Sequence, residues 1–536
     1  MESSNNLYRA VVETKNQYPN ARALLFMGKY ITYEQLVNKI DLFANGINSL
    51  GLKKDEVITM ALPNVFEAIY SFYATNKLGI VGHMVHPITP IMQMRKFMQT
   101  TNSKFLIVLD TFFEHYQELL KDGIKIILIS PVDEFGLIKK IGYRVINRKR
   151  LKAIKYGENI IKFSSLYIEK PYISEIPKDP MKTSVYLHSG GTSGEPKTIE
   201  LSSYSINYLA GKASYILGKN DFLDKHMLGV LPMFHGFGLC TGIHGVLMVG
   251  GVCTLMPKFN ADETIKLIKN NQINYIIGVP SLFEALLKNP EFSHPNIKNI
   301  EQAFVGGDYV ALDLKNRFNK AMDLVGSSAR LLEGYGLTEV VTVCSVNTIK
   351  YQKQTSVGKA LPGIDMAIVD VDTKVFLGPN KNGIIAVSGP TMMNGYLNDP
   401  EATKEATLIE NDKKWILTGD LGFIDEDGYV HFKQRLKRII KVSGIPVLPA
   451  EIENLLMSYE SISEVAAIGI PDEDKGNMVK LFIVWHPNKE KIDYNKLKEI
   501  IKMNLGTYAV PKEIVELKRL PKTEIGKVNI IELEKM

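Results

Sequence analysis

The sequence of 536 residues lacks several features that mark secreted or nucleic-acid-binding proteins. Its three cysteines, Cys240, Cys253 and Cys344, lie far apart without the spacing of metal ligands, which favours reduced thiols in a cytoplasm. Residues 1–17 contain no apolar signal-peptide core, so we expect a cytoplasmic protein. With 64 basic and 58 acidic residues, the chain has no charge excess that would imply a nucleic-acid partner.

Charged residues are also missing from one long internal stretch. Residues 227–257 contain no Asp, Glu, Lys or Arg, and this length could span a bilayer. Two histidines, two prolines and many glycines interrupt the stretch, and residues 251–256 have the pattern of a buried strand. We therefore expect a strand, a loop, a helix and a strand inside a protein core rather than a membrane helix.

The pattern of apolar residues predicts the fold class. In the first two-thirds of the chain, helical stretches alternate with short apolar runs, which is typical of α/β layers with parallel sheets. Residues 363–435 change to short strands and turns. The expected fold is α/β, with a large N-terminal domain (residues 1–436) of layered α/β subdomains plus a β-rich subdomain. A small α+β C-terminal domain (residues 437–536) follows.

Residues 188–202, HSGGTSGEPKTIELS, have the composition of a phosphate-binding loop. A Walker-type loop opens a helix, but Pro196 lacks an N–H and residues 198–201 alternate polar and apolar as in a strand. Residues 183–187 also have strand character, and a helix over 204–217 is expected to follow. The segment is therefore predicted to be a glycine-rich turn between two strands. Its glycines, hydroxyls and lysine can hold phosphate; the alternative is a polar surface hairpin.

Three further motifs follow in order. They are EGYGLTE at 333–339, LTGDLG at 417–422 with RLKRIIKVSG at 435–444, and PKTEIGK at 521–527. With the glycine-rich turn, they closely resemble the adenylate-forming superfamily, which includes acyl-CoA synthetases, luciferases and the adenylation domains of nonribosomal peptide synthetases. The resemblance covers nearly the whole chain. It implies that a carboxylate is joined to the α-phosphate of ATP and that pyrophosphate is released.

The resemblance also implies which residues bind ATP. Because the carboxylate and ATP are both anions, cations and oriented donors must offset their repulsion. Mg²⁺ accepts few protein oxygen ligands, and Thr192 and Glu339 are implied to hold it; for Glu339 the alternative is a solvated surface acid. Asp420 and Arg435 are implied to bind the ribose, and Tyr335 to face the adenine. The full set is Ser189, Gly190, Gly191, Thr192, Ser193, Gly194, Lys197, Gly307, Asp308, Glu333, Gly334, Tyr335, Gly336, Thr338, Asp420, Arg435 and Lys527.

A mobile C-terminal domain is a further implication of the resemblance. It would rotate about a hinge at Lys437 between two half-reactions. In the first, Lys527 reaches the ribose and the attacking carboxylate. In the second, Lys441, Ser443 and Gly444 turn inward to help bind CoA. The implied catalytic residues are Lys527, Thr192, Glu339 and Lys441.

The acyl group must lie beside the nucleotide. Residues 231–238, LPMFHGFG, resemble the family segment that lines this pocket, and they contain no Asp or Glu to pair with a substrate amino group. This absence favours a hydrophobic carboxylic acid. His235 either orients the carboxylate or is a structural histidine. The predicted pocket residues are Phe234, His235, Gly236, Phe237 and Gly306.

We therefore predict an AMP-forming acid–thiol ligase that converts a hydrophobic acid, such as a fatty acid, to acyl-AMP and acyl-CoA. ATP and CoA are the expected co-substrates and Mg²⁺ the expected cofactor. The main alternative is an acyl-AMP ligase that loads an acyl carrier protein. A luciferase-like oxygenase and a non-catalytic nucleotide sensor are further alternatives; the sensor is disfavoured because the metal, ribose and C-terminal lysine positions are all filled.

One run of charge remains. Residues 139–155, KKIGYRVINRKRLKAIK, hold eight basic residues and no acidic one. The run is either a solvated surface segment or a contact with an anionic membrane surface or an acidic carrier protein. A membrane contact would make the protein peripheral to a membrane.

Overall fold

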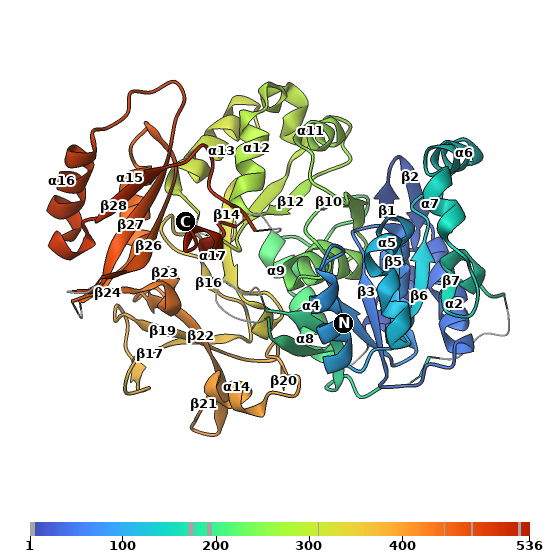
Figure 1. The fold of residues 1–536 in the computed structure, drawn as a ribbon. Helices are drawn as coiled ribbons and strands as arrows, with labels where there is room; N and C mark the ends of the chain where they lie inside the picture. The colour runs from blue at the N-terminus through green and yellow to red at the C-terminus, as the bar shows by residue number, and fades with distance from the viewer. Residues whose placement is uncertain are drawn as a thin grey trace.

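The computed structural model describes residues 6–169, 175–176, 178–189, 196–308, 310–443, 445–472, 475–523 and 527–536 (Figure 1). Two long sheets form its N-terminal part. The first has the strand order β20-β9-β8-β4-β3-β5-β6-β7, and β4, β3, β5, β6 and β8 run parallel. Its strands are β3 (Val57–Ala61), β4 (Val81–Met84), β5 (Phe105–Leu109), β6 (Lys125–Ile129), β7 (Ile160–Lys162), β8 (Thr183–His188), β9 (Thr198–Ser202) and β20 (Gly395–Tyr396).

The second sheet has the order β16-β15-β14-β13-β12-β10-β11-β1-β2, with parallel pairing from β14 through β1. The carboxyl ends of parallel strands meet at one edge, where ligands of such sheets bind. Its strands are β1 (Arg22–Phe26), β2 (Lys29–Thr32), β10 (His226–Gly229), β11 (Val252–Leu255), β12 (Tyr275–Gly278), β13 (Gln302–Val305), β14 (Leu331–Gly336), β15 (Val343–Val346) and β16 (Lys359–Ala360).

Helices cover these sheets, and α3 is buried over its whole length. Its Lys77 has no exposed side chain and pairs with Asp41 at 2.8 Å, as a buried charge requires. The helices are α1 (Leu7–Gln17), α2 (Tyr33–Ser49), α3 (Phe66–Lys77), α4 (Ile91–Thr100), α5 (Phe113–Tyr116), α6 (Leu137–Ile146), α7 (Arg148–Ala153), α8 (Ser203–Ala210), α9 (Ala213–Leu217), α10 (Gly245–Met248), α11 (Ala261–Lys269), α12 (Pro280–Lys288) and α13 (Leu312–Leu324).

The uncharged stretch at 227–257 folds as predicted. It ends β10, passes through a loop and the π-helix η4 (Phe237–His244) into α10, and closes with β11. In the described ranges, no helix has both the length and the apolar character needed to cross a bilayer. The single helix expected over 204–217 is wrong, because the chain breaks at Gly211 and Lys212 into α8 and α9.

The β-rich region predicted at 363–435 is confirmed as a sheet with the order β18-β17-β19-β22-β21, to which β23 adds through β22. Its elements are β17 (Asp365–Val369), β18 (Phe376–Leu377), β19 (Gly383–Ser388), α14 (Pro400–Glu405), β21 (Thr407–Glu410), β22 (Lys413–Ile424) and β23 (Val430–Arg435).

The C-terminal elements form a smaller α+β unit at one end of the molecule (Figure 1). The predicted division at 436/437 falls in a short 3-10 turn, Leu436–Arg438, and stays a prediction. The elements are β24 (Ile440–Val442), β25 (Ile445–Val447), α15 (Pro449–Met457), β26 (Ile462–Asp472), β27 (Gly476–Trp485), α16 (Tyr494–Leu505), β28 (Glu513–Glu516) and α17 (Ile530–Leu533).

Candidate active site

The glycine-rich segment joins two antiparallel strands, as its pattern predicted. His188 at the end of β8 pairs with Thr198 at the start of β9. The base of the turn is closed by Ser189 N–H, which donates to Lys197 O at 2.9 Å, and by Lys197 N–H, which donates to Ser189 Oγ at 3.0 Å. The remaining predicted phosphate-loop residues lie outside the described residues: Gly190, Gly191, Thr192, Ser193 and Gly194.

Lys197 and Glu339 are linked through a residue that the sequence did not suggest. The Lys197 Nζ lies 4.6 Å from the ring centroid of Tyr396, and the Tyr396 hydroxyl donates to Glu339 Oε1 at 2.9 Å. Burial raises the pKa of Glu339, and the bond from Tyr396 opposes that shift. Tyr396 lies on the short strand β20, far from both partners in sequence, so no local pattern could have identified it.

The surroundings of Glu339 suit a magnesium ion. Within the described residues, no cluster of three or more His, Cys, Asp or Glu side chains is positioned as a complete metal site. Mg²⁺ is usually bound by one or two carboxylates, with water and substrate phosphates as its other ligands. One half-buried carboxylate, linked through Tyr396 to Lys197, fits this ion better than it fits a metal held wholly by protein ligands.

The chain makes a strained turn directly after Glu339. Val341 has φ 69° and ψ −60°, and the Thr342 N–H donates to Val340 O at 2.9 Å, which together define a γ-turn. A positive φ is costly for a β-branched residue, and such strain gathers at functional sites. The turn brings the Val341 carbonyl against Gly236, where an added Cβ would lie only 1.8 Å from the oxygen. The predicted acyl segment and the Glu339 segment are therefore in backbone contact.

We expect Gly236→Ala to lower the free energy of unfolding by about 2–3 kcal/mol, because a methyl group at this position must displace a backbone carbonyl. The midpoint of urea unfolding measures the change. Gly378→Ala is the matched control, since a Cβ there meets nothing within 4 Å. If Gly236→Ala and Gly378→Ala unfold at the same urea concentration, the γ-turn can shift to accommodate the methyl group without a cost in stability, and the prediction is wrong.

Asp420 lies at the centre of the predicted ribose site. It is buried on β22 opposite Arg435 of β23, and its Oδ1 lies 3.4 Å from Arg435 Nε. Its Oδ2 accepts a 2.7 Å hydrogen bond from the Tyr335 hydroxyl. No described residue donates a hydrogen bond to Oδ1, although this oxygen is buried. A buried acceptor without a donor is costly, and a ligand hydroxyl would relieve that cost.

Tyr335 was expected to face the adenine, and the structure shows that its hydroxyl also holds the Asp420 carboxylate. The residue is buried, and its ring centroid lies 5.8 Å from that of Phe432. Its place as the adenine-facing ring stays a prediction. Burial raises the pKa of Asp420, and Arg435, Tyr335 and Lys527 oppose that shift, in that order.

Lys527 lies among these residues. Its Cε is 4.0 Å from the position that a Cβ on Gly307 would take, and Gly307 has φ +81°. Burial lowers the pKa of Lys527, while the charges of Asp308 and Asp420 raise it. The structure therefore places the C-terminal lysine beside Gly307, just after the carboxyl end of β13. Its role in the first of the two expected arrangements stays a prediction.

His235 lies near the same lysine. Burial, and then the charge of Lys527, lowers the pKa of His235 to about 4, so the ring is uncharged at neutral pH. The Phe237 N–H donates to His235 Nδ1 at 3.2 Å, and the Phe234 ring packs edge-on against His86. Positive charge at this point comes from Lys527 and Arg435 rather than from the histidine.

The other predicted residues of β13 and β14 differ in their surroundings. Glu333 pairs with Lys315 at 2.7 Å, so its carboxylate is already neutralised by a lysine that sequence reasoning missed. Gly306 and Gly336 face backbone carbonyls so closely that a Cβ would lie 2.7 Å from Gly334 O and 1.5 Å from Thr342 O, respectively. Thr338 is buried beside them.

The predicted CoA residues do not join this group. Lys441 is exposed on β24, and its carbonyl accepts from Asn477 of β27 at 3.4 Å. The Ser443 N–H donates to Lys475 O at 2.8 Å. Gly444 lies outside the described residues, as does the side chain of the hinge candidate Lys437. Both described residues are bound to their own C-terminal unit.

The layered α/β sheets, the β-rich sheet and the smaller C-terminal α+β unit have the architecture of an adenylate-forming enzyme. The chain belongs to the family of AMP-binding enzymes: residues 11–397 match the model of the AMP-binding enzyme, and residues 451–527 match that of its C-terminal domain. It is an AMP-forming acid–thiol ligase of the adenylate-forming superfamily.

Similar proteins include the long-chain-fatty-acid–CoA ligase of Bacillus subtilis (strain 168), which is 29% identical over 97% of this chain and 93% of the relative. The 4-coumarate–CoA ligase 4 of Arabidopsis thaliana is 28% identical over 94% of this chain and 85% of the relative. The crystal structure of ATP-bound MatB from Rhodopseudomonas palustris matches with a TM-score of 0.86 at 22% identity and 99% coverage of both chains. A benzoate CoA ligase from Burkholderia xenovorans LB400 matches with a TM-score of 0.84 at 19% identity, over 99% of this chain and 100% of the other.

Proposed function

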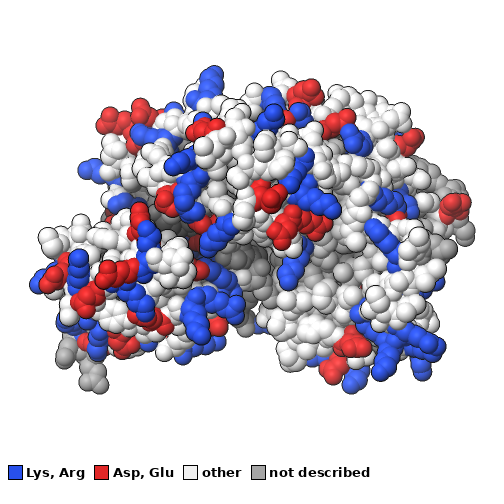
Figure 2. Space-filling view, turned by 90° about the horizontal axis from the view of Figure 1, so that it is seen from above, with Lys and Arg blue, Asp and Glu red and all other residues white. Residues whose placement is uncertain are grey.

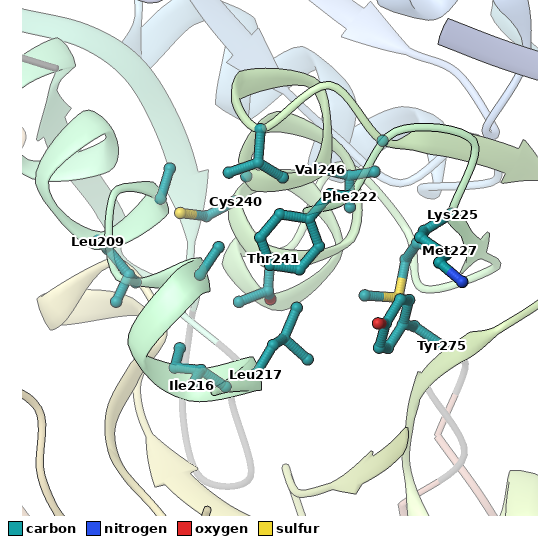
Figure 3. A pocket seen from close by; sticks show the side chains of 15 residues that line it. Leu209, Ile216, Leu217, Phe222, Lys225, Met227, Cys240, Thr241, Val246 and Tyr275 are labelled. Carbon is teal, nitrogen blue, oxygen red and sulfur yellow. The ribbon is translucent and has the colours of Figure 1, made fainter. Parts of the chain in front are cut away.

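We propose that the protein converts an apolar acid, in the first instance a fatty acid, to acyl-AMP and then to acyl-CoA. The observation that carries this proposal is a cavity of about 50 Å³ (Figure 3), which is lined in part by residues that follow the predicted acyl segment in sequence and by none of the five predicted pocket residues themselves. Thr241, one turn after Phe237 on the π-helix η4, forms part of its wall. The other lining side chains are mostly apolar and include Leu209, Ile216, Leu217, Phe222 and Val246.

The polar side chains at this cavity are occupied elsewhere. The Thr241 hydroxyl donates to Phe237 O at 2.5 Å, and the Tyr275 hydroxyl donates to Glu301 at 2.9 Å. Lys225 Nζ pairs with the same Glu301 at 2.5 Å. Because none of these groups is left to bind a charged or hydroxylated tail, the cavity favours hydrocarbon. Its volume has room for roughly four water-sized spheres, and hence for a few carbon atoms.

The residues predicted to bind ATP would each contact a different part of the substrates. Lys197 and the loop before it hold the β- and γ-phosphates, while Asp420 and Arg435 hold the ribose hydroxyls. Glu339 and Thr192 would hold Mg²⁺, which supplies positive charge against the phosphate oxygens. Lys527 orients the carboxylate towards the α-phosphate and offsets the negative charge that the two anions bring together. Lys441, Ser443 and Gly444 serve the later CoA step.

We expect Ala213→Phe to shift the preference of the enzyme towards shorter acids, because the added ring fills the cavity from α9. Losing room for two methylene groups corresponds to about 1.6 kcal/mol, or roughly a fifteenfold change in relative kcat/KM. Ser214→Phe is the matched control, since the neighbouring residue does not line the cavity. A parallel series of straight-chain acids measures the profile, and an unchanged profile in Ala213→Phe would place the acyl chain elsewhere.

A further inference from the structure

Helix α6 presents its apolar face to solvent. The side chains of Ile138, Ile141 and Val145 are 88%, 51% and 70% exposed, and Ile146 is 84% exposed. At 3.6 residues per turn, the first three lie on one face of the helix, with Ile146 at its edge. A surface helix ordinarily turns such a stripe towards the core. Here the stripe points away from the protein.

The opposite face of α6 fixes the helix through polar contacts. The Tyr143 hydroxyl donates to Oδ1 of the buried Asp110. Arg150 of α7 donates to the Tyr143 oxygen at 2.7 Å and lies 3.4 Å from the same carboxylate. Lys139 Nζ lies 4.5 Å from the ring centroid of Phe135. These contacts hold α6 in the orientation that exposes the aliphatic stripe to solvent.

Positive charge surrounds the exposed stripe. Figure 2 shows lysine and arginine side chains gathered at the right-hand end of the molecule, which in Figure 1 carries α6 and α7. Exposed basic residues flank the stripe on both helices, and the sequence from 139 to 155 has no acidic residue to neutralise them. The exposed members are Lys139, Arg144, Arg148, Lys149, Lys152 and Lys155.

We propose that α6 and α7 form a docking surface for an anionic phospholipid bilayer. Ile138, Ile141 and Val145 enter the boundary between headgroups and acyl chains, and the basic residues contact the phosphates. An acidic carrier protein would satisfy the cations but would leave the aliphatic side chains in water. A second copy of the chain would bring two basic surfaces together. A bilayer with anionic headgroups satisfies both features at once.

The surface is suitably placed for an enzyme whose C-terminal domain must move. In Figure 1, α6 and α7 lie at the opposite end of the molecule from α15 and α16. A bilayer at α6 therefore leaves the C-terminal unit in water. The docking surface shares no residue with the candidate active site, so its failure would leave the proposed function untouched.

Flotation of the full-length protein with vesicles tests the proposal. We expect binding to vesicles of phosphatidylcholine with phosphatidylglycerol, and little binding to phosphatidylcholine alone. Ile138→Ser with Ile141→Ser and Val145→Ser should lower the partition coefficient by about tenfold or more. Lys149→Glu with Lys152→Glu should do the same, with a difference that shrinks as salt rises, because exposed charges are screened over about 10 Å at 0.1 M.

A matched variant removes equally exposed apolar side chains from other surfaces: Leu324→Ser, Ile409→Ser and Met503→Ser, at 79%, 72% and 86% exposure. It should bind vesicles like the parent, and all variants should keep parental activity on a soluble acid. Equal vesicle binding by the parent and the α6 variants would overturn the proposal. So would an α6 variant that loses only self-association in gel filtration, or only capture of an acyl carrier protein.

Discussion

Replacing Lys527 with alanine is expected to slow acyl-adenylate formation by about a hundredfold or more, while thioester formation from supplied acyl-adenylate continues. Loss of one charge contact at a developing anion costs about 3 kcal/mol or more, which sets this magnitude. Lys527 lies against Gly307, and the charges of Asp308 and Asp420 act on it. Burial is the larger of the two causes that lower the pKa of His235, and it remains in the variant, so we do not expect this ring to replace the lost cation.

The two half-reactions separate this role from a structural one. Acid-dependent exchange of pyrophosphate into ATP measures the first, and release of acyl-CoA from added acyl-adenylate measures the second. Lys522→Ala is the matched control, because this lysine pairs on the surface with Glu464 at 2.6 Å. Lys441→Ala should show the reverse pattern, with exchange retained and thioester formation lost. If Lys527→Ala loses both half-reactions equally, the two-arrangement mechanism is wrong for this protein.

Glu339→Gln is expected to lower adenylation by about a thousandfold, or about 4 kcal/mol of barrier, with no loss of fold. The amide keeps the shape of the side chain and can still accept the Tyr396 hydroxyl bond, but it removes the negative charge that would hold Mg²⁺. Pyrophosphate release at rising Mg²⁺ concentration measures the effect.

Tyr396→Phe provides the comparison for that variant. It removes the hydrogen bond to Glu339 but keeps the ring beside Lys197, so we expect a loss of only about tenfold. Thermal unfolding of both variants should match the parent. If Glu339→Gln turns over at the parental rate at saturating Mg²⁺, Glu339 does not hold the metal.

Local patterns in the sequence were sufficient to predict the elements that carry the site. Pro196 and the alternation after it indicated a turn between strands, and β8 and β9 confirm that interpretation. The helix that follows is capped by Ser202, whose Oγ accepts from the Ser205 N–H at 3.0 Å. The break between α8 and α9 was missed because the apolar period continues across Gly211.

Contacts between distant segments were not predictable in this way. Tyr396 reaches Glu339 across 57 positions, and the carbonyl of Val341 in the γ-turn lies against Gly236, more than a hundred positions away in the sequence. The orientation of α6 is the clearest example. Its periodicity shows that the helix has an apolar face, but the contacts of Tyr143 and Arg150 with Asp110, which no local pattern reveals, turn that face outward.

The substrate class is the central claim, and one measurement tests it most directly. Purified enzyme is given ATP, Mg²⁺ and a panel of acids that includes straight-chain fatty acids, aromatic acids, dicarboxylic acids and amino acids, with and without CoA. We predict pyrophosphate release with the straight-chain apolar acids, and AMP with acyl-CoA in equal amounts once CoA is added. Turnover confined to dicarboxylic or amino acids, or pyrophosphate release with no CoA thioester from any acid, would contradict the account.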